Sequence, residues 1–390
     1  MALNAELKLI PLERSWRKAN ALKQIPRDNL PRYFFKAFEP QTIAPIDFPP
    51  IDVFQCKNTV LLSHARLSRR INLLCDSNAL PIEIGTLNLD YVIGIYKQVK
   101  RSADEHEPPL IPTTHRVVSK RCVLLAGWDP RSWGHFLIEY LPRLLLLKKY
   151  FRTNEVLPIC ISEATPGFII SAMNILLREY NPQFIFFEDN TLTLFEDVIV
   201  PPYINYGDQR GYHPFLSLAL EEWIGETITP INGDNSEDKV YISRKHNSHS
   251  PTTPQRPIVN EDELIERLVE AGFKIVAMEE LDIIEKLKVM SSAKLVIGGL
   301  GSGTHNSLLS TSYPSVVSLG LGFSNSQDHV CDIKNQAYFQ IPTFEPTDKT
   351  KIITRIGGKA QYVNIDNVLS AVEHVLKRRE SPFNWQLVER

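Results

Sequence analysis

The sequence has few of the features that mark membrane, metal-binding or disulfide-stabilised proteins. Its five cysteines are scattered and form no C-x-x-C pair, which argues against a disulfide framework and against a zinc site. The N-terminus lacks the basic start and apolar run of a signal peptide. The most apolar stretch, at 136–147, is too short and too charged to span a bilayer. These absences predict a cytoplasmic protein without a transmembrane segment.

An excess of charge of one sign is also missing. The formal net charge is −2, so neither nucleic acid nor a membrane surface is an expected partner. No acidic D-x-D-type motif occurs in a polar loop, which favours a site that works without a metal. The length of 390 residues favours two domains, because a single core rarely grows that large.

Strand and helix patterns alternate in two blocks of the chain. In the first block, helices are expected at 133–151 and 167–180, between strands at 120–127, 157–162 and 183–188. The alternation restarts with a strand at 240–243 and continues through strands at 274–278, 294–297 and 315–319. This pattern is typical of parallel strands covered by helices on both faces. The expected fold class is therefore α/β, with two Rossmann-like parallel-sheet domains facing across a cleft.

The domain boundaries follow from the polar segments. The stretch 225–239 contains proline and glycine and is the expected linker. We therefore expect an N-terminal domain at 1–225 and a C-terminal domain at 226–363. A last helix within 364–390 is expected to cross back to the first domain. The first 52 residues are rich in proline and aromatic residues and are expected to form loop with short helices.

The most informative segment is the glycine-rich stretch LVIGGLGSGTHN at 295–306, which joins a strand to a helix. Glycines let a ligand approach the backbone, and the N–H groups of such a turn attract phosphate. Thr304 stands where the dinucleotide-binding fingerprint has its third glycine, and no Walker A lysine follows. The alternative is a tight turn without a ligand. The candidate phosphate-binding residues are Gly299, Gly301, Ser302, Gly303 and Asn306.

Arg244 is the second candidate, because it directly follows an expected strand. Ligands bind at the carboxyl ends of strands in open α/β sheets, and a planar guanidinium suits phosphate oxygens. The alternative is an ion pair with a surface carboxylate. Asn260 and Glu261 open the next helix, where Asn260 either contributes to the site or caps the helix.

His135 is the candidate catalytic base, in the first turn of the helix at 133–151. An imidazole titrates near neutrality, and a helix N-terminus is expected to lower its pKa and favour the neutral form. Glu139 lies one turn later on the same face. It would orient His135, act as the base itself, or pair with Arg143. The alternative for His135 is a structural histidine in the domain core.

Three motifs in this order resemble glycosyltransferase family 61. They are W-G-H-F-x-x-E-x-L-P-R-L, then I-S-R with a later R-x-x-x-N-E, and then A-x-x-x-I-G-G-x-G-S-G-x-x-N, and they cover about residues 121–321. The resemblance implies the GT-B arrangement of two Rossmann-like domains. It also implies sugar transfer with inversion, usually without a metal. A nucleoside-diphosphate sugar would be the donor substrate, with no further cofactor.

The resemblance extends to the individual candidate residues. Arg244 matches the family's arginine after the strand, and Asn260 and Glu261 match its N-E pair. Leu300 and Ser302 depart from the family, which usually has histidine and alanine there. The glycine-rich loop matches the family's loop at Gly299, Gly301, Gly303 and Asn306. His305 is a conjectural replacement for the missing imidazole.

The implied function is transfer of a sugar from a nucleoside diphosphate to a glycan hydroxyl, in capsular or surface polysaccharide biosynthesis. The first domain would hold the acceptor and the base, and the second domain the nucleotide sugar. One alternative is an enzyme similar to polysaccharide pyruvyltransferases. The other is a non-catalytic glycan-binding subunit with the same fold.

Overall fold

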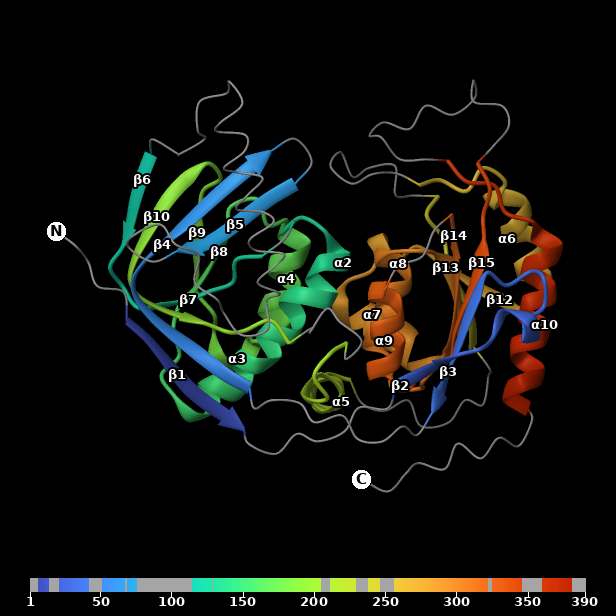
Figure 1. Cartoon of the computed structure of the whole chain (residues 1–390), viewed down its shortest axis with the longest axis horizontal. Helices are drawn as coiled ribbons and strands as arrows, with labels where there is room; N and C mark the ends of the chain where they lie inside the picture. Colours follow the sequence, from blue (N-terminus) through green and yellow to red (C-terminus); the bar gives the residue numbers. More distant parts are fainter. Residues whose placement is uncertain are drawn as a thin grey trace. The chain divides into compact units, whose positions relative to one another are not determined.

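The chain folds into two compact α/β units (Figure 1). The computed structural model describes residues 6–13, 21–41, 51–66, 69–75, 114–127, 129–204, 211–228, 238–245, 256–321, 325–345 and 360–380. Unit 1 comprises Met1–Ala21, Thr42–Pro230 and Asp282–Glu285. Unit 2 comprises Leu22–Gln41, Ile231–Leu281 and Lys286–Arg390.

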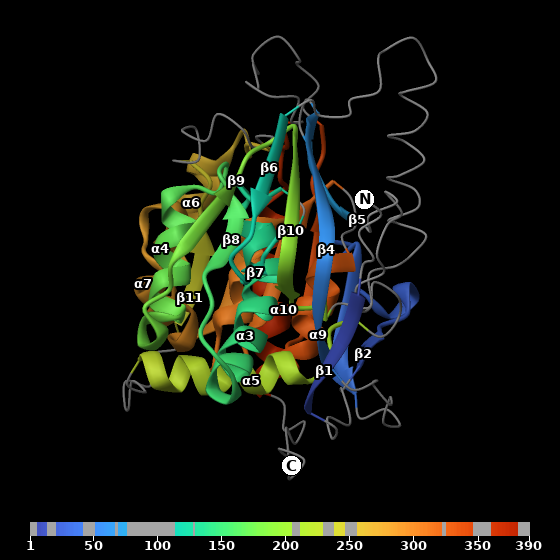
Figure 2. The same cartoon turned by 90° about the vertical axis from the view of Figure 1, so that its left-hand side faces the viewer.

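Unit 1 contains an eight-stranded mixed sheet in the order β1-β4-β10-β7-β8-β9, with β5 beside β4 and β6 beside β10. Its strands are β1 (Glu6–Glu13), β4 (Ile51–Arg66), β5 (Arg69–Cys75), β6 (Thr114–Val118), β7 (Cys122–Leu124), β8 (Ile159–Ser162), β9 (Phe184–Phe187) and β10 (Thr191–Val200). Its helices are α2 (Trp133–His135), the π-helical turn η2 (Phe136–Tyr140), α3 (Leu141–Thr153), α4 (Gly167–Leu176), η3 (Arg178–Tyr180) and α5 (Phe215–Thr227). Figure 2 shows β4, β10, β7 and β8 side by side.

Only part of this sheet is parallel. Strands β7, β8 and β9 run parallel to one another, as the alternation predicted, and β10 runs parallel to β7, but β4 is antiparallel to β1, β5 and β10. The predicted parallel sheet of unit 1 is therefore confirmed in part, because antiparallel strands extend it. One of its cores, as far as the structure describes it, contains strand residues alone, such as Phe54, Leu61 and Phe195.

A wide helical turn separates α2 from α3. Ser132 precedes α2, and its hydroxyl accepts a hydrogen bond from the backbone N–H of His135. Pro142 lies at the start of α3, where it cannot donate a backbone hydrogen bond. The helix expected at 133–151 is thus interrupted by the π-helical turn η2 just before Pro142. Such turns are often found at functional sites.

Unit 2 contains a seven-stranded sheet in the order β12-β11-β13-β14-β15-β3-β2. Its strands are β2 (Ala21–Gln24), β3 (Lys36–Gln41), β11 (Asp238–Ile242), β12 (Phe273–Val276), β13 (Ala293–Gly299), β14 (Ser315–Gly320) and β15 (Tyr338–Pro342). Its helices are η1 (Arg27–Asn29), α6 (Glu261–Glu270), η5 (Met278–Glu280), α7 (Ile283–Ser292), α8 (Ser302–His305), η6 (Asn306–Leu309), α9 (Asn325–Ile333) and α10 (Ile365–Glu380). Helices α6 and α10 cover one face, and α7, α8 and α9 lie on the other (Figure 1).

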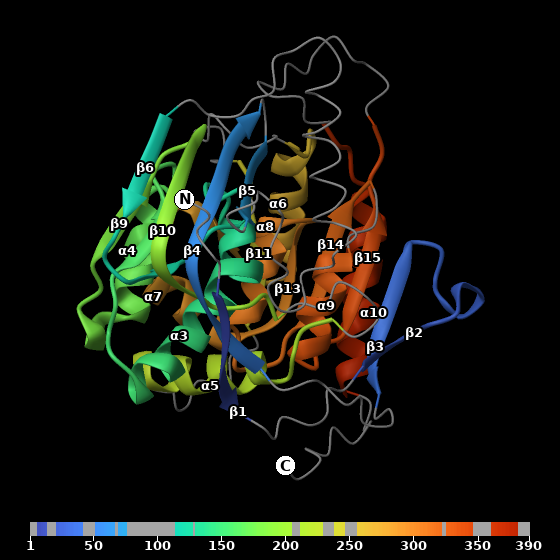
Figure 3. The same cartoon turned by 60° about the vertical axis from the view of Figure 1, so that its left-hand side comes forward.

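The N-terminal segment supplies the antiparallel edge of this second sheet. Strand β3 pairs with β15, and β2 follows at the edge, which Figure 3 shows as two blue strands beside the orange-red ones. Phe34 is buried in the same core as Phe339 and Val372 of α10. The expectation of loop with short helices over the first 52 residues is therefore wrong for the described part. Only η1 is helical there.

Two expected segments are only partly described. The expected linker 225–239 is occupied by the end of α5 up to Thr227 and by the start of β11 at Asp238, and 229–237 lie outside the described residues. Helix α10 packs within unit 2 through Val368, Ala371 and Val375. Residues 381–390 lie outside the described residues, and the crossing of this segment to the first domain stays a prediction.

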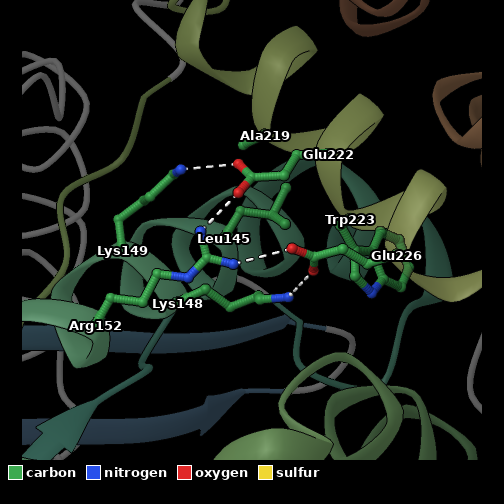
Figure 4. A pocket seen from close by; sticks show the side chains of 8 residues that line it. All are labelled: Leu145, Lys148, Lys149, Arg152, Ala219, Glu222, Trp223 and Glu226. Atoms are coloured by element: carbon green, nitrogen blue, oxygen red, sulfur yellow. Dashed lines mark hydrogen bonds and ion pairs between the residues drawn. The ribbon is translucent and has the colours of Figure 1, made fainter.

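Paired charges join α3 to α5 in unit 1 (Figure 4). Lys148 lies 2.8 Å from Glu226 and 3.2 Å from Glu179, and its side chain is only 8% exposed. Arg152 contacts both Glu222 and Glu226 at 2.6 and 3.0 Å. Burial by itself would raise the pKa of Glu226, but Lys148 and then Arg152 outweigh burial and lower it. Glu226 therefore stabilises unit 1 when it is ionised.

We predict that Glu226→Gln lowers the thermal unfolding midpoint by about 1–4 °C at neutral pH, because a half-exposed ion pair contributes about 0.5–1 kcal/mol. A carboxylate with a lowered folded-state pKa contributes fully above its ordinary value of 4.5 and loses this contribution as the pH falls through the lower value. Melting curves from pH 7 to pH 3 should converge for the two proteins. Glu155→Gln, an exposed site after α3, is the control, and an equal loss there would contradict the prediction.

Candidate functional site

The glycine turn and Arg244 lie at the same edge of the unit 2 sheet. Strands β11 and β13 are parallel neighbours, with Ile242 opposite Gly298. Arg244 follows β11, and the turn begins at Gly299, the last residue of β13. Both segments therefore leave the sheet at the carboxyl ends of adjacent strands, where open α/β sheets bind ligands.

The Arg244 guanidinium lies directly on the glycine turn. Its Nη2 donates hydrogen bonds to the carbonyl oxygens of Gly299 and Leu300 at 3.1 and 3.0 Å. A Cβ on Gly299 would lie 3.1 Å from Nε of Arg244, so a side chain at position 299 would displace the guanidinium. These bonds to backbone, rather than to a surface carboxylate, fix the guanidinium over the turn.

A second arginine, Arg256, meets Arg244 at the same turn. A Cβ on Gly301 would lie 3.1 Å from Nη2 of Arg256 and 3.2 Å from Nη2 of Arg244. Burial and then the charge of Arg256 lower the pKa of Arg244 to about 10, and burial lowers the pKa of Arg256. Both side chains stay charged at neutral pH, so the two cations repel each other. An anion between them would remove this repulsion.

Sequence reasoning did not select Arg256 as a site residue. It stood in the R-x-x-x-N-E motif, which was the available signal, but its approach to Gly301 is a long-range contact that local sequence does not reveal.

Glu261 faces the protein instead of a ligand. Its Oε1 accepts hydrogen bonds from the hydroxyls of Tyr241 and Ser243 and from the backbone N–H of Arg244, at 3.0, 2.9 and 2.9 Å. The side chain is buried. Glu261 therefore fixes the end of β11 and the start of the Arg244 segment.

Two asparagines of the site also bond to backbone. Asn260 precedes α6 without capping it and instead pairs with the N–H and C=O of Val363. Asn306 donates hydrogen bonds to the carbonyl oxygens of Ser302 and Gly303 and so stabilises the backbone of the turn. Ser302 and Gly303 belong to α8, which has only four residues before the chain continues as a 3-10 turn.

His305 and Leu300 point away from the arginines. The ring Nδ1 of His305 lies 2.9 Å from the amide oxygen of Gln327, and the side chain is 5% exposed. Leu300 packs on Gly320, where a Cβ would come within 2.8 Å of it. Neither side chain fits the conjectured role of an imidazole replacement at the turn.

His135 and Glu139 form a pair in unit 1. Nδ1 of His135 lies 2.7 Å from Oε1 of Glu139. The histidine side chain is 35% exposed, whereas the glutamate is 16% exposed. The second oxygen of Glu139, Oε2, is buried without a hydrogen-bond partner. The pair can therefore accept a proton or a hydrogen bond at a partly open position after β7.

The prediction that the helix N-terminus lowers the pKa of His135 is wrong. Burial does lower it, but the hydrogen bond and charge of Glu139, followed by the charge of Asp129, raise the pKa overall.

Arg143 bonds to backbone carbonyls and does not form the ion pair with Glu139 that the sequence left open. It is 2% exposed and donates to the carbonyl oxygens of Leu124, Ala126 and Pro201. The guanidinium also lies over the Tyr203 ring, 4.7 Å from its centroid. Arg143 therefore joins the ends of β7 and β10 underneath the His135–Glu139 pair.

The groove between α3 and α5 is filled by the ion pairs of Figure 4. Among the described residues, no group of three or more His, Cys, Asp or Glu side chains is placed to hold a metal ion. No helix within the described ranges is long and apolar enough to cross a membrane. Cys56, Cys122, Cys160 and Cys331 are buried free thiols.

An arginine pair on a glycine turn, together with a histidine–carboxylate pair elsewhere in the chain, is suited to an enzyme that acts on a phosphorylated ligand. Residues 133–317 match the family model described as Glycosyltransferase 61. No curated protein matches the chain. The matched segment contains all the candidate residues and supports glycosyltransferase family 61, and with it a glycosyltransferase activity.

We predict that Gly301→Ala disrupts the arginine pair. Gly301 has φ +123°, which L-residues rarely adopt, and the added Cβ would crowd both guanidinium groups. We expect a loss of about 1–3 kcal/mol in the free energy of unfolding, measured by denaturant titration. Gly225→Ala is the matched control, because a Cβ there meets nothing within 4 Å and a helical alanine is favourable. A Gly301→Ala variant as stable as wild type would contradict this geometry.

Proposed function

We propose that this chain is an inverting family 61 glycosyltransferase of the GT-B type, which moves a sugar from a nucleoside diphosphate to a glycan hydroxyl. Unit 2 would bind the donor, and unit 1 the acceptor. The observation that carries the proposal is the convergence of Arg244 and Arg256 on Gly301.

The arginine pair suits the diphosphate of the donor. Each guanidinium presents a planar set of N–H donors that matches phosphate oxygens. Burial and then the charge of Arg256 lower the pKa of Arg244, and a bound dianion would relieve the repulsion between the two cations, which favours binding. Because Gly299 and Gly301 have no side chains, both guanidinium groups can lie against the backbone of the turn. As the sugar departs, the same cations stabilise the growing charge on the diphosphate.

The His135–Glu139 pair suits deprotonation of the acceptor. The base would take the proton of the glycan hydroxyl as its oxygen attacks the anomeric carbon from the side opposite to the diphosphate. The carbon–oxygen bond to the acceptor forms while the bond to the diphosphate breaks, which inverts the anomeric centre. The cationic arginines take the role that a metal ion has in other transferases, so we propose that the reaction is metal-independent. We place it in the cytoplasm, in capsular or surface polysaccharide synthesis.

The first test concerns the donor. Arg244→Ala and Arg256→Ala should each weaken nucleoside-diphosphate binding by roughly 1.5–3 kcal/mol, the range for hydrogen bonds to charged groups. Isothermal titration calorimetry with UDP, GDP, CDP and ADP in excess EDTA measures the effect. Lys245→Ala is the control, because Lys245 is exposed in the same segment and pairs with Asp262.

The donor proposal fails if wild type binds no nucleoside diphosphate, or if both arginine variants bind as wild type does. Binding of phosphoenolpyruvate instead would favour a pyruvyltransferase-like enzyme. Thermal melting of each variant separates lost binding from lost folding.

The second test concerns the base. His135→Ala should lower turnover by about 10²–10⁴-fold and leave donor binding unchanged. Because the neutral imidazole is the active form and its pKa is raised above 6.5, the wild-type rate should rise with pH through a value above 6.5. Glu139→Gln should move this midpoint down, since Glu139 causes much of the increase.

The size of the Glu139→Gln defect separates two mechanisms. A loss smaller than that of His135→Ala indicates that Glu139 orients the ring, and an equal or larger loss makes the carboxylate the base. Normal turnover in a folded His135→Ala variant would remove His135 from the mechanism. Nucleotide and glycan binding without any transfer would instead indicate a non-catalytic glycan-binding subunit.

A further inference from the structure

Trp133 and Phe168 form an aromatic patch in unit 1, of which Phe168 is the exposed member. Phe168, at the start of α4, is 55% exposed. Its ring centroid lies 6.2 Å from that of Trp133, at the start of α2. Trp133 in turn packs at 5.0 Å on Phe136, which is 1% exposed and anchors it in the core. Phe136 therefore anchors the patch in the core through Trp133, and Phe168 is its exposed part.

The patch lies where the sheet of unit 1 would present a ligand. Strands β7 and β8 are parallel neighbours, α2 follows β7, and α4 follows β8. Both aromatic residues thus belong to the first turns after the carboxyl ends of adjacent strands. A Cβ on Gly167, next to Phe168, would meet nothing within 4 Å, so the space beside the patch is open.

The chemistry of this neighbourhood fits a carbohydrate. The faces of pyranose rings carry C–H groups that stack on aromatic rings, and their edges carry hydroxyls that need hydrogen-bond partners. Trp133 and Phe168 supply the aromatic surface.

The spacing sets a minimum size for the ligand. Trp133 and His135 are two residues apart on one helix, and such residues point to different sides. A helix with its side chains is about 10–12 Å wide, so one sugar ring cannot lie on the patch and also present a hydroxyl to His135. A ligand that reaches both has at least two sugar units.

From this arrangement we infer that Trp133 and Phe168 form an acceptor subsite that stacks a sugar ring remote from the reacting hydroxyl, and that the acceptor is an oligosaccharide. The inference rests on the proposed function for the identity of His135 as the reacting end. The stacking itself is independent of catalysis and can be measured as binding.

The test is binding of the purified full-length chain to an array of neutral and acidic glycans from one to six sugar units. Wild type should bind oligosaccharides and not monosaccharides. Phe168→Ala should weaken this binding by about tenfold, because an aromatic contact of this kind contributes roughly 1 kcal/mol or more. Phe168→Tyr should retain binding, whereas Phe168→Leu should not.

The matched control is Phe186→Ala, an exposed phenylalanine of β9 in the same unit, which should bind as wild type does. The subsite is refuted if wild type binds no glycan, if monosaccharides bind equally well, or if Phe168→Ala and Phe186→Ala behave alike. Nucleoside-diphosphate titration of the same preparations is the separate readout of the proposed function. If the chain binds a nucleoside diphosphate but Phe168→Ala leaves glycan binding unchanged, the subsite is refuted and the transferase proposal stands. If Phe168→Ala weakens glycan binding but the chain binds no nucleoside diphosphate, the transferase proposal is refuted and the subsite stands.

Discussion

The arrangement of the donor site depends on one carboxylate oxygen, Oε1 of Glu261. It accepts three hydrogen bonds at the end of β11, one of them from the backbone of Arg244. A buried carboxylate would be costly without such partners, and here the partners are the groups that have to be aligned. The Arg244 guanidinium can reach the carbonyls of the neighbouring glycine turn because its backbone is fixed in this way. Glu261 thus determines the geometry of the turn without facing the ligand.

The sequence predicted the elements around this site better than its side-chain contacts. The position of Arg244 after a strand and the glycines after the next strand but one follow from local periodicity, which survives in any α/β sheet. The orientation of Glu261 toward Tyr241 and Ser243 depends on packing between α6 and β11. Such packing cannot be predicted from the residues next to Glu261 in the sequence. Arg256 is a similar case, because its approach to Gly301 is a long-range contact.

The errors at the fold level have the same physical origin. Strand β4, with 16 residues, pairs with three other strands, and its antiparallel direction is decided by partners far along the chain. For His135, the helix-dipole argument used a local effect, whereas the ion pair with Glu139 is closer and stronger. Where a nearby charge and a helix terminus act in opposite directions, the charge decides the sign.

The pairing of β3 with β15 has a consequence for how the chain is made. A ribosome releases residues 36–41 long before it synthesises 338–342, and until then β2 is the sole partner of β3 among the described strands of unit 2. Almost the whole of unit 1 lies between them in the sequence. Strands β2 and β3 can therefore join the sheet of unit 2 only after the ribosome has synthesised the part of unit 1 that lies between β3 and β15. Such a high-contact-order step is slow and late, and it leaves a strand edge exposed to wrong partners in the meantime.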